Sequence, residues 1–150
     1  MTVVDKIERK MLLPVGRERA WRAVTEPAEL CKWFAPECSF SLNVGSPLRM
    51  VWEDGAVSRG VIEQIDPPQR FVFRWHAKAA PYSDPLTAAN STVVTFKLEP
   101  VEGGTLLRVT ESGFSGLPES VRDQILSENT SGWNAELAEL SAYTAQLERE

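Results

Sequence analysis

Histidine and cysteine are scarce in this sequence of 150 residues. The chain has one histidine, His76, and two cysteines, Cys31 and Cys38. Two cysteines are too few for a disulfide framework, and with a single histidine they make a weak zinc site. We therefore interpret both as structural thiols and expect no metal, no cofactor and a reducing, cytoplasmic location.

Positive charge and long apolar runs are also lacking. The 16 Lys and Arg residues against 21 Asp and Glu residues give a formal net charge of −5. Nucleic-acid binding is disfavoured, because contacts with phosphates need a basic surface. No apolar run approaches the roughly 20 residues of a membrane-spanning helix, and charges interrupt residues 1–13, where a signal peptide would be apolar. We expect neither a nucleic acid nor a membrane as a partner.

Residue patterns for nucleophilic catalysis and for phosphate binding are missing as well. His76 shares its side of a predicted strand with Val72 and Arg74, which places it on the outer face of a sheet. No serine or cysteine then gains a histidine partner for a catalytic triad. Gly103 and Gly104 form a predicted hairpin turn rather than a phosphate-binding loop.

The sequence does contain a long amphipathic segment at residues 117–150. Leu126, Trp133, Leu140 and Leu147 recur every seven residues, and at about 100° per residue they share one face of a helix. Over roughly 30 residues this helix would span about 45 Å. A helix of this length needs a broad apolar surface to lie on.

The residues before this helix predict such a surface. Apolar and polar residues alternate in several runs separated by turn residues, which is typical of strands joined by hairpins. Sequential hairpins form an antiparallel sheet with one face covered, so the predicted fold class is α+β, within one domain of residues 1–150. Two short predicted helices are expected to clamp one edge of the sheet. The predicted strands are residues 4–13, 37–42, 48–53, 57–66, 71–76, 92–99 and 107–114, the short helices are residues 17–25 and 27–34, and a loop covers residues 77–90.

Four groups of residues carry a resemblance to a known family. They are AWRAVTEP at residues 20–27 with WFAP at 33–36, GVIEQIDPP at 60–68 with FVFRW at 71–75, VTESGF at 109–114, and GW at 132–133 with Leu137, Leu140 and Tyr143. Together they resemble the START-like (SRPBCC, helix-grip) superfamily, and within it the branch similar to the C-terminal domain of heat-shock-protein-90 ATPase activators. The resemblance covers nearly the whole chain.

This resemblance implies a helix-grip fold, in which a curved antiparallel sheet and two short helices wrap around a long C-terminal helix. It also implies an apolar cavity between the sheet and that helix. Members of the family often carry a histidine where this chain has Glu111, and residues 77–90 make a comparatively long connection. Both departures lie where a cavity mouth is expected, so the identity of the ligand does not transfer.

One flank of the long helix favours a ligand cavity. Asn129, Gly132 and Glu136 stand at three- and four-residue spacing, where a solid core would place leucines. A few polar groups within apolar walls are typical of a small-molecule site. The alternatives are that this flank meets solvent or the short helices, and that the aromatic residues of the strands are plain core packing. The residues predicted to surround a ligand are Trp33, Phe34, Met50, Trp52, Val61, Phe73, Trp75, Phe96, Val109, Glu111, Asn129, Gly132, Trp133 and Glu136.

Two strand carboxylates are weak candidates for catalysis. Glu111 shares strand parity with Val109, which would direct it inward. Its burial would then require a cation or hydrogen-bond donors, for which Arg59 or Arg74 could serve, although Glu111 could equally face water near the end of the sheet. Glu63 would also point inward, unless a bulge shifts the parity.

These observations lead to three functional hypotheses. The first is a non-enzymatic protein, a monomer or a homodimer, that binds a small apolar or aromatic molecule. The second is an enzyme of the cyclase, dehydratase or hydrolase type that uses a carboxylate of the cavity as acid or base. The third is a partner of the heat-shock chaperone, which ranks last because the activators have an additional N-terminal domain and this chain begins at the helix-grip portion.

Overall fold

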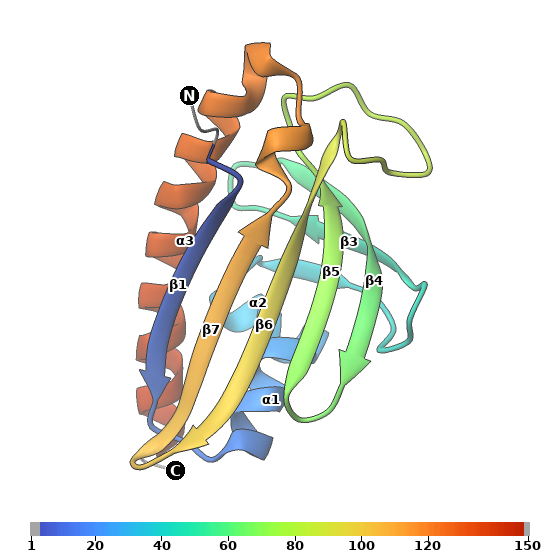
Figure 1. The fold of residues 1–150 in the computed structure, drawn as a ribbon. Helices are drawn as coiled ribbons and strands as arrows, with labels where there is room; N and C mark the ends of the chain where they lie inside the picture. Colours follow the sequence, from blue (N-terminus) through green and yellow to red (C-terminus); the bar gives the residue numbers. More distant parts are fainter. Residues whose placement is uncertain (1–3, 149–150) are drawn as a thin grey trace.

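The computed structural model describes residues 4–148, as a seven-stranded sheet with two short helices and one long C-terminal helix (Figure 1). The α+β helix-grip fold is therefore confirmed. The elements are β1 (Lys6–Leu13), α1 (Arg17–Thr25), α2 (Pro27–Trp33), β2 (Glu37–Ser39), β3 (Pro47–Val51), β4 (Val57–Asp66), β5 (Arg70–His76), β6 (Ser91–Val101), β7 (Gly104–Ser112), the 3-10 turn η1 (Phe114–Gly116) and α3 (Glu119–Glu148).

The strands follow one another by antiparallel pairing in the order β1-β7-β6-β5-β4-β3-β2. From β2 to β7 each strand pairs with the next along the chain, as predicted for sequential hairpins. β1, the first strand of the chain, pairs with β7, the last one, and lies at the edge of the sheet. In Figure 1 the sheet is strongly curved, and α3 runs alongside β1 on the side where α1 and α2 also lie.

The apolar face of α3 follows the predicted seven-residue pattern most closely in its middle. Trp133 and Leu140 are buried, whereas Leu126 and Leu147 near the two ends are half-buried. Phe96 of β6 meets Trp133 edge-on with ring centroids 6.0 Å apart. The inner face of the sheet and α3 therefore share one core. Among the described residues, no helix is long and apolar enough to cross a membrane.

The prediction that the short helices clamp one edge of the sheet holds for α2, which packs against the edge strand β2, and is wrong for α1. α1 packs against β6 and β7, while α2 packs against β2 and α3. The indole nitrogen of Trp33 donates a 2.8 Å hydrogen bond to the carbonyl of Ala23, which joins the two helices. Ala20, Ala23 and Val24 of α1 and Leu30 and Trp33 of α2 are buried, so the pair packs on the inner side of the sheet, with α2 at its β2 edge.

A bulge in β4 decides which of its side chains face inward. The pairing with β5 shifts between Ile62 and Gln64, which inserts Glu63 as an extra residue. Ile62 is buried opposite Phe73, so Glu63 is exposed and Val61 lies on the outer face. Val61 therefore does not line a cavity between sheet and helix, and its predicted place there is corrected.

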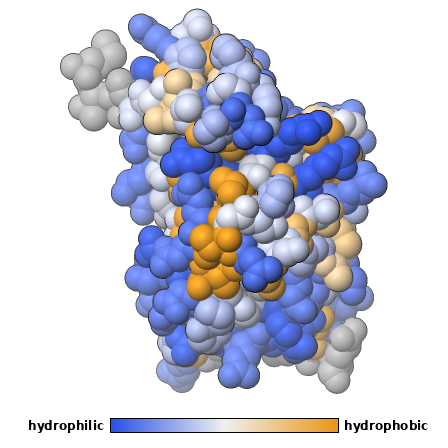
Figure 2. All heavy atoms as spheres, turned by 90° about the vertical axis from the view of Figure 1, so that its right-hand side faces the viewer, coloured by the Kyte–Doolittle hydropathy of each residue, from blue (hydrophilic) through white to orange (hydrophobic). Residues whose placement is uncertain are grey.

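The outer side of this part of the sheet has an apolar surface of its own. Figure 2 faces the side formed by β3, β4 and the loop after β5, which is mostly hydrophilic with one hydrophobic patch near its centre. Val61 lines a hollow on the outside of the sheet together with Tyr82 and Leu86. This hollow is separate from the inner face that contacts α3.

Candidate functional site

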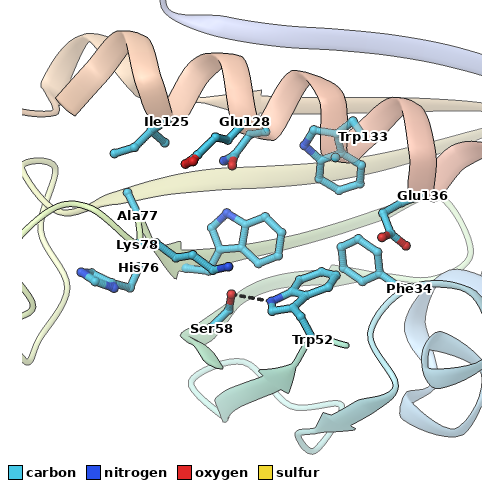
Figure 3. Close-up of a pocket in the computed structure, with 13 residues that line it drawn as sticks. Phe34, Trp52, Ser58, His76, Ala77, Lys78, Ile125, Glu128, Trp133 and Glu136 are labelled. Atoms are coloured by element: carbon cyan, nitrogen blue, oxygen red, sulfur yellow. Dashed lines mark hydrogen bonds between the residues drawn. The ribbon is translucent and has the colours of Figure 1, made fainter. Parts of the chain in front are cut away.

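A cavity of about 340 Å³ lies between α3 and the inner side of the sheet (Figure 3). This volume falls within the range typical of small-molecule sites. Four aromatic rings form much of its wall: Phe34 after α2, Trp52 after β3, Trp75 of β5 and Trp133 of α3. The cavity is therefore assembled from segments that are far apart in the sequence.

Phe34 is the ring that joins this aromatic wall. Its centroid lies 5.0 Å from that of Trp52, 6.0 Å from that of Trp75 and 5.4 Å from that of Trp133. Its plane is within 16° of Trp75 and 22° of Trp133, and it meets Trp52 edge-on. Rings packed at these distances support one another, so the four rings form one continuous apolar wall of the cavity.

The polar flank of α3 faces this cavity. Asn129, Gly132 and Glu136 all line it, with Ile125 and Glu128 one turn earlier. A Cβ atom added to Gly132 would have no neighbour within 4 Å, so the missing side chain leaves open space. The interruption of the apolar stripe seen in the sequence therefore coincides with the cavity.

Glu111 lies directly behind the aromatic wall. It is 0% exposed, and its carboxylate accepts four hydrogen bonds. Trp133 Nε1 donates to Oε1 at 2.8 Å, and Trp75 Nε1 (3.0 Å), Thr92 Oγ1 (2.5 Å) and Asn129 Nδ2 (2.9 Å) donate to Oε2. Four donors satisfy the acceptor capacity of a carboxylate. Glu111 therefore holds residues of the wall and is not in contact with the cavity.

The expected cationic partners of Glu111 are located elsewhere. Arg74 lies on the outer face, where its Nε is 3.1 Å from Oε2 of Glu63 and its Nη1 donates to Ser91 at 2.9 Å. Arg59 is exposed and lines the outer hollow. Neutral donors have replaced the predicted cation. Because Glu63 is exposed in this outer ion pair, it has no place in the cavity.

Glu136 is the carboxylate that does reach the cavity, and in Figure 3 it points toward Phe34. Burial, together with smaller contributions from the nearby carboxylates of Glu139 and Glu53, raises the pKa of Glu136 from 4.5 to about 7. No ion pair within 4.0 Å involves Glu136 among the residues that the structure describes. A proton on this group is therefore exchanged near neutral pH.

A second hollow of about 560 Å³ adjoins the cavity and shares Phe34, Trp52, Lys78 and Glu136 with it. The predicted site residue Trp33 lines this neighbour. The other charged groups around Glu136 here are Lys32, Glu53, Asp54 and Glu139.

The remaining predicted site residues pack in the core behind the wall. Met50, Phe73, Phe96 and Val109 are all buried there and do not line the cavity. These positions match the alternative interpretation of alternating aromatics as core. The alternation of side chains along a strand predicts that they point inward. It does not predict how deep they lie, because depth depends on the curvature of the sheet.

Several residues of the cavity were not predicted from the sequence. They are Ser58, His76, Ala77, Lys78, Ile125 and Glu128. Ile125 and Glu128 precede Asn129 and Gly132 by one helical turn, so the helical spacing could have indicated them. The ring of His76 points away from the indoles in Figure 3, and its Nε2 lies 2.7 Å from the carbonyl oxygen of Ala80.

Neither cysteine lines the aromatic cavity, and Cys31 lines the adjoining hollow. Both are free thiols, Cys31 exposed and Cys38 half-buried, and burial followed by the proximity of Cys31 raises the pKa of Cys38 to about 12. Within residues 4–148 no group of three or more His, Cys, Asp or Glu side chains is arranged to hold a metal ion.

Comparisons with known proteins place this fold among relatives. A family model described as "Activator of Hsp90 ATPase homolog 1-like protein" matches residues 14–145. No curated protein matches the chain.

Solved structures repeat the same architecture. Protein MLL2253 from Mesorhizobium loti is similar with a TM-score of 0.78 and 22% identity, over 94% of this chain and 97% of that one. DynU16, described as a putative protein in the dynemicin biosynthetic locus, has a TM-score of 0.74 and 23% identity, over 94% of this chain and 47% of that one. The Aha1 dimer from Colwellia psychrerythraea has a TM-score of 0.73 and 20% identity, over 92% and 94%. At these identities the similarity shows a shared fold.

Proposed function

The chain belongs to the Activator of Hsp90 ATPase homolog 1-like family, and we propose that it is a small-molecule-binding domain whose ligand occupies the cavity between the sheet and α3. Membership in the family confirms the resemblance to the START-like superfamily. The proposal depends on one observation: the cavity of about 340 Å³ is walled by four aromatic rings and lies open at Gly132.

The composition of the wall supports an apolar or aromatic ligand. Phe34, Trp52, Trp75 and Trp133 present flat surfaces that a planar molecule would cover, and burial of apolar area is the main favourable term in such binding. The polar groups of Asn129, Ser58 and Glu136 stand among these rings. A few polar groups of this kind orient a ligand within apolar walls.

A thermal-shift screen of planar aromatic compounds and lipids, run in parallel on two phenylalanine variants, tests the proposal. Gly132→Phe directs a ring into the open space of the cavity. Ser131→Phe adds the same ring at an exposed neighbouring position that does not line it. At a concentration 100 times its Kd, a ligand stabilises the folded state by about 2.7 kcal/mol. We expect this effect in the wild type and Ser131→Phe, and its loss in Gly132→Phe. Equal stabilisation of both variants would place the ligand elsewhere.

A second candidate function, an enzyme, is favoured by Glu136. This side chain lines the cavity, and burial raises its pKa to about 7, close to the value that suits a general acid or base at neutral pH. Glu111 does not touch the cavity and Glu63 lies outside it, so neither takes this role. Incubation of each bound compound with wild type and Glu136→Gln, followed by mass spectrometry, separates the two functions. Turnover that Glu136→Gln loses while binding persists supports the enzyme, and unchanged compounds support binding alone.

We also make proposals on the domain organisation, the location and the oligomeric state of this chain. We propose that residues 1–150 act as one domain, in a reducing cytoplasm that suits the free thiols of Cys31 and Cys38. We also propose a homodimer, since the family neighbour from Colwellia psychrerythraea is described as a dimer. Light scattering coupled to size exclusion measures the mass in solution, and a mass of one chain would contradict the dimer.

A further inference from the structure

The indole N–H groups of the cavity wall are already engaged within the protein. Trp52 donates to the hydroxyl oxygen of Ser58 at 2.8 Å, as Figure 3 shows. Trp75 and Trp133 both donate to Glu111, at 3.0 and 2.8 Å. An indole has one polar hydrogen and no acceptor. The three tryptophans therefore offer a ligand their rings but no hydrogen-bond donor.

Glu111 also fixes the direction of the Asn129 amide. The Asn129 Nδ2 atom lies 2.9 Å from Oε2 of Glu111, and a carboxylate that already receives three other donors is an acceptor at this point. Rotating the amide by half a turn would bring two oxygen atoms together. The nitrogen must therefore face Glu111. Among the residues that the structure describes, Oδ1 of Asn129 then has no hydrogen-bond donor, and Asn129 lines the cavity.

The polar groups that remain for a ligand are mainly acceptors. The Asn129 Oδ1 atom and the two oxygens of the Glu136 carboxyl group are three acceptor atoms on the α3 side of the cavity. The donors are the remaining hydrogen of the Ser58 hydroxyl and the second N–H of the Asn129 amide. At the exposed rim, Glu128 and Lys78 carry opposite charges and offset one another. Within the cavity, acceptors thus outnumber donors.

Resting on the binding function proposed above, we propose that the cavity selects planar aromatic molecules that carry a hydrogen-bond donor, an amine above all, and that Glu111 sets this preference by fixing the Asn129 amide. An amine donates to Asn129 Oδ1 or, about two helical turns further along α3, to Glu136. Its positive charge is attracted by the faces of the surrounding rings.

A ligand that carries only acceptors meets an unfavourable site. Its planar part covers the rings equally well, but Asn129 Oδ1 loses contact with water and gains no donor. An unpaired buried acceptor costs free energy comparable to a lost hydrogen bond. A site built around such a group rejects the analogue that lacks the matching donor.

Three naphthalene probes that differ in one substituent test the preference by isothermal titration calorimetry. They are 2-naphthylmethylamine, 2-naphthylmethanol and 2-acetylnaphthalene, which present an ammonium, a hydroxyl and a ketone acceptor. We expect the amine and the alcohol to bind about tenfold or more tightly than the ketone. Equal binding of all three, or tighter binding of the ketone, overturns the preference and leaves the proposed function in place. Absence of binding by all three contradicts the proposed function and this inference together.

Two variants test the role of Glu111 through the ratio of the affinities. Asn129→Leu removes the acceptor at a half-buried position of α3, and we expect the ratio of amine to ketone affinity to fall toward one. Glu111→Gln replaces one carboxylate oxygen with a donor, so the Asn129 amide is no longer held in one direction and the ratio falls as well. A purely structural role would weaken all three probes by a common factor and preserve the ratio, which is the result that would overturn this role of Glu111.

Discussion

Replacing Glu111 with leucine tests whether the buried carboxylate contributes to the free energy of unfolding. Leucine has a similar size and no acceptor, so the four donors that converge on Glu111 lose their partner. They do not lose it equally. Thr92 and Trp75 keep a hydrogen bond with each other, because Trp75 Nε1 donates to Thr92 Oγ1 at 3.1 Å. Asn129 is half-buried at the cavity and within reach of water.

The full penalty therefore falls on Trp133. Its side chain is 3% exposed, and its indole nitrogen has Glu111 as its hydrogen-bond partner. A buried donor without an acceptor costs about 1–3 kcal/mol, and the weakened bond of Trp75 adds up to about 1 kcal/mol. Relief from burying a charge offsets part of this cost. We expect Glu111→Leu to lower the free energy of unfolding by about 2–3 kcal/mol.

Urea denaturation followed by far-ultraviolet circular dichroism measures this loss without relying on tryptophan emission. Glu99→Leu is the matched control, because Glu99 forms an exposed ion pair with Arg108 and its loss should change stability by less than about 0.5 kcal/mol. Trp133→Phe removes the indole N–H that Glu111→Leu leaves without an acceptor. In the double variant, the loss of unfolding free energy should therefore be smaller than the sum of the two single losses. A Glu111→Leu protein as stable as the wild type, or fully additive costs, would refute the reasoning.

Three further predictions concern Glu136, Gly132 and the cysteines. Because burial raises the pKa of Glu136 from 4.5 to about 7, the folded state retains a proton that the unfolded chain loses in this window, so stability falls as the pH rises from about 4.5 to 7. Discounted for the partial exposure of the side chain, Glu136→Gln should be about 1 kcal/mol more stable than the wild type near pH 8 and equal to it near pH 4. Urea titrations at both pH values measure this difference, and the exposed Glu128→Gln serves as the control that should not show it. Gly132→Ala should raise the free energy of unfolding by about 0.5–1 kcal/mol, because the added Cβ meets open space and the helix gains propensity; a loss of stability would show that the site is filled. Cys31 should react with iodoacetamide at least about tenfold faster than Cys38, whose pKa burial raises to about 12, and equal rates in peptide mapping would contradict this.

Much of the fold could be predicted because local patterns determine it. The alternation of side chains within Phe71–Trp75 and the seven-residue spacing of Trp133 and Leu140 are properties of neighbouring residues, and the structure buries these side chains as expected. The outward direction of Val61 could not be predicted, because the bulge after Ile62 shifts the parity of β4 and leaves no clear mark in the sequence. The position of α1 was predicted wrongly for a related reason, since packing between distant elements decides it.

In the candidate site, too, residues in a local pattern could be predicted and contacts between distant residues could not. Asn129, Gly132 and Glu136 were recognisable because they interrupt an apolar helix face at helical spacing, and all three line the cavity. Glu111 was recognisable only as a carboxylate in need of partners. Its donors come from β5, β6 and α3, and they stand between 18 and 36 residues away in the chain. No local pattern connects residues so far apart, so a cation appeared the simpler partner.

The cavity and the attachment of α3 are two consequences of one arrangement. A helix that carries Asn129, Gly132 and Glu136 where leucines would pack gives up apolar contacts on that flank, and the space they would fill is the cavity. Glu111 compensates at the same level of the helix, because it binds Trp133 and Asn129 of α3 to the sheet through hydrogen bonds. Polar attachment of this kind leaves a void beside the helix that packed side chains would close. The residue that stabilises α3 over the sheet is therefore the one that allows the cavity to remain open, and variants of Glu111 should change stability and ligand preference together.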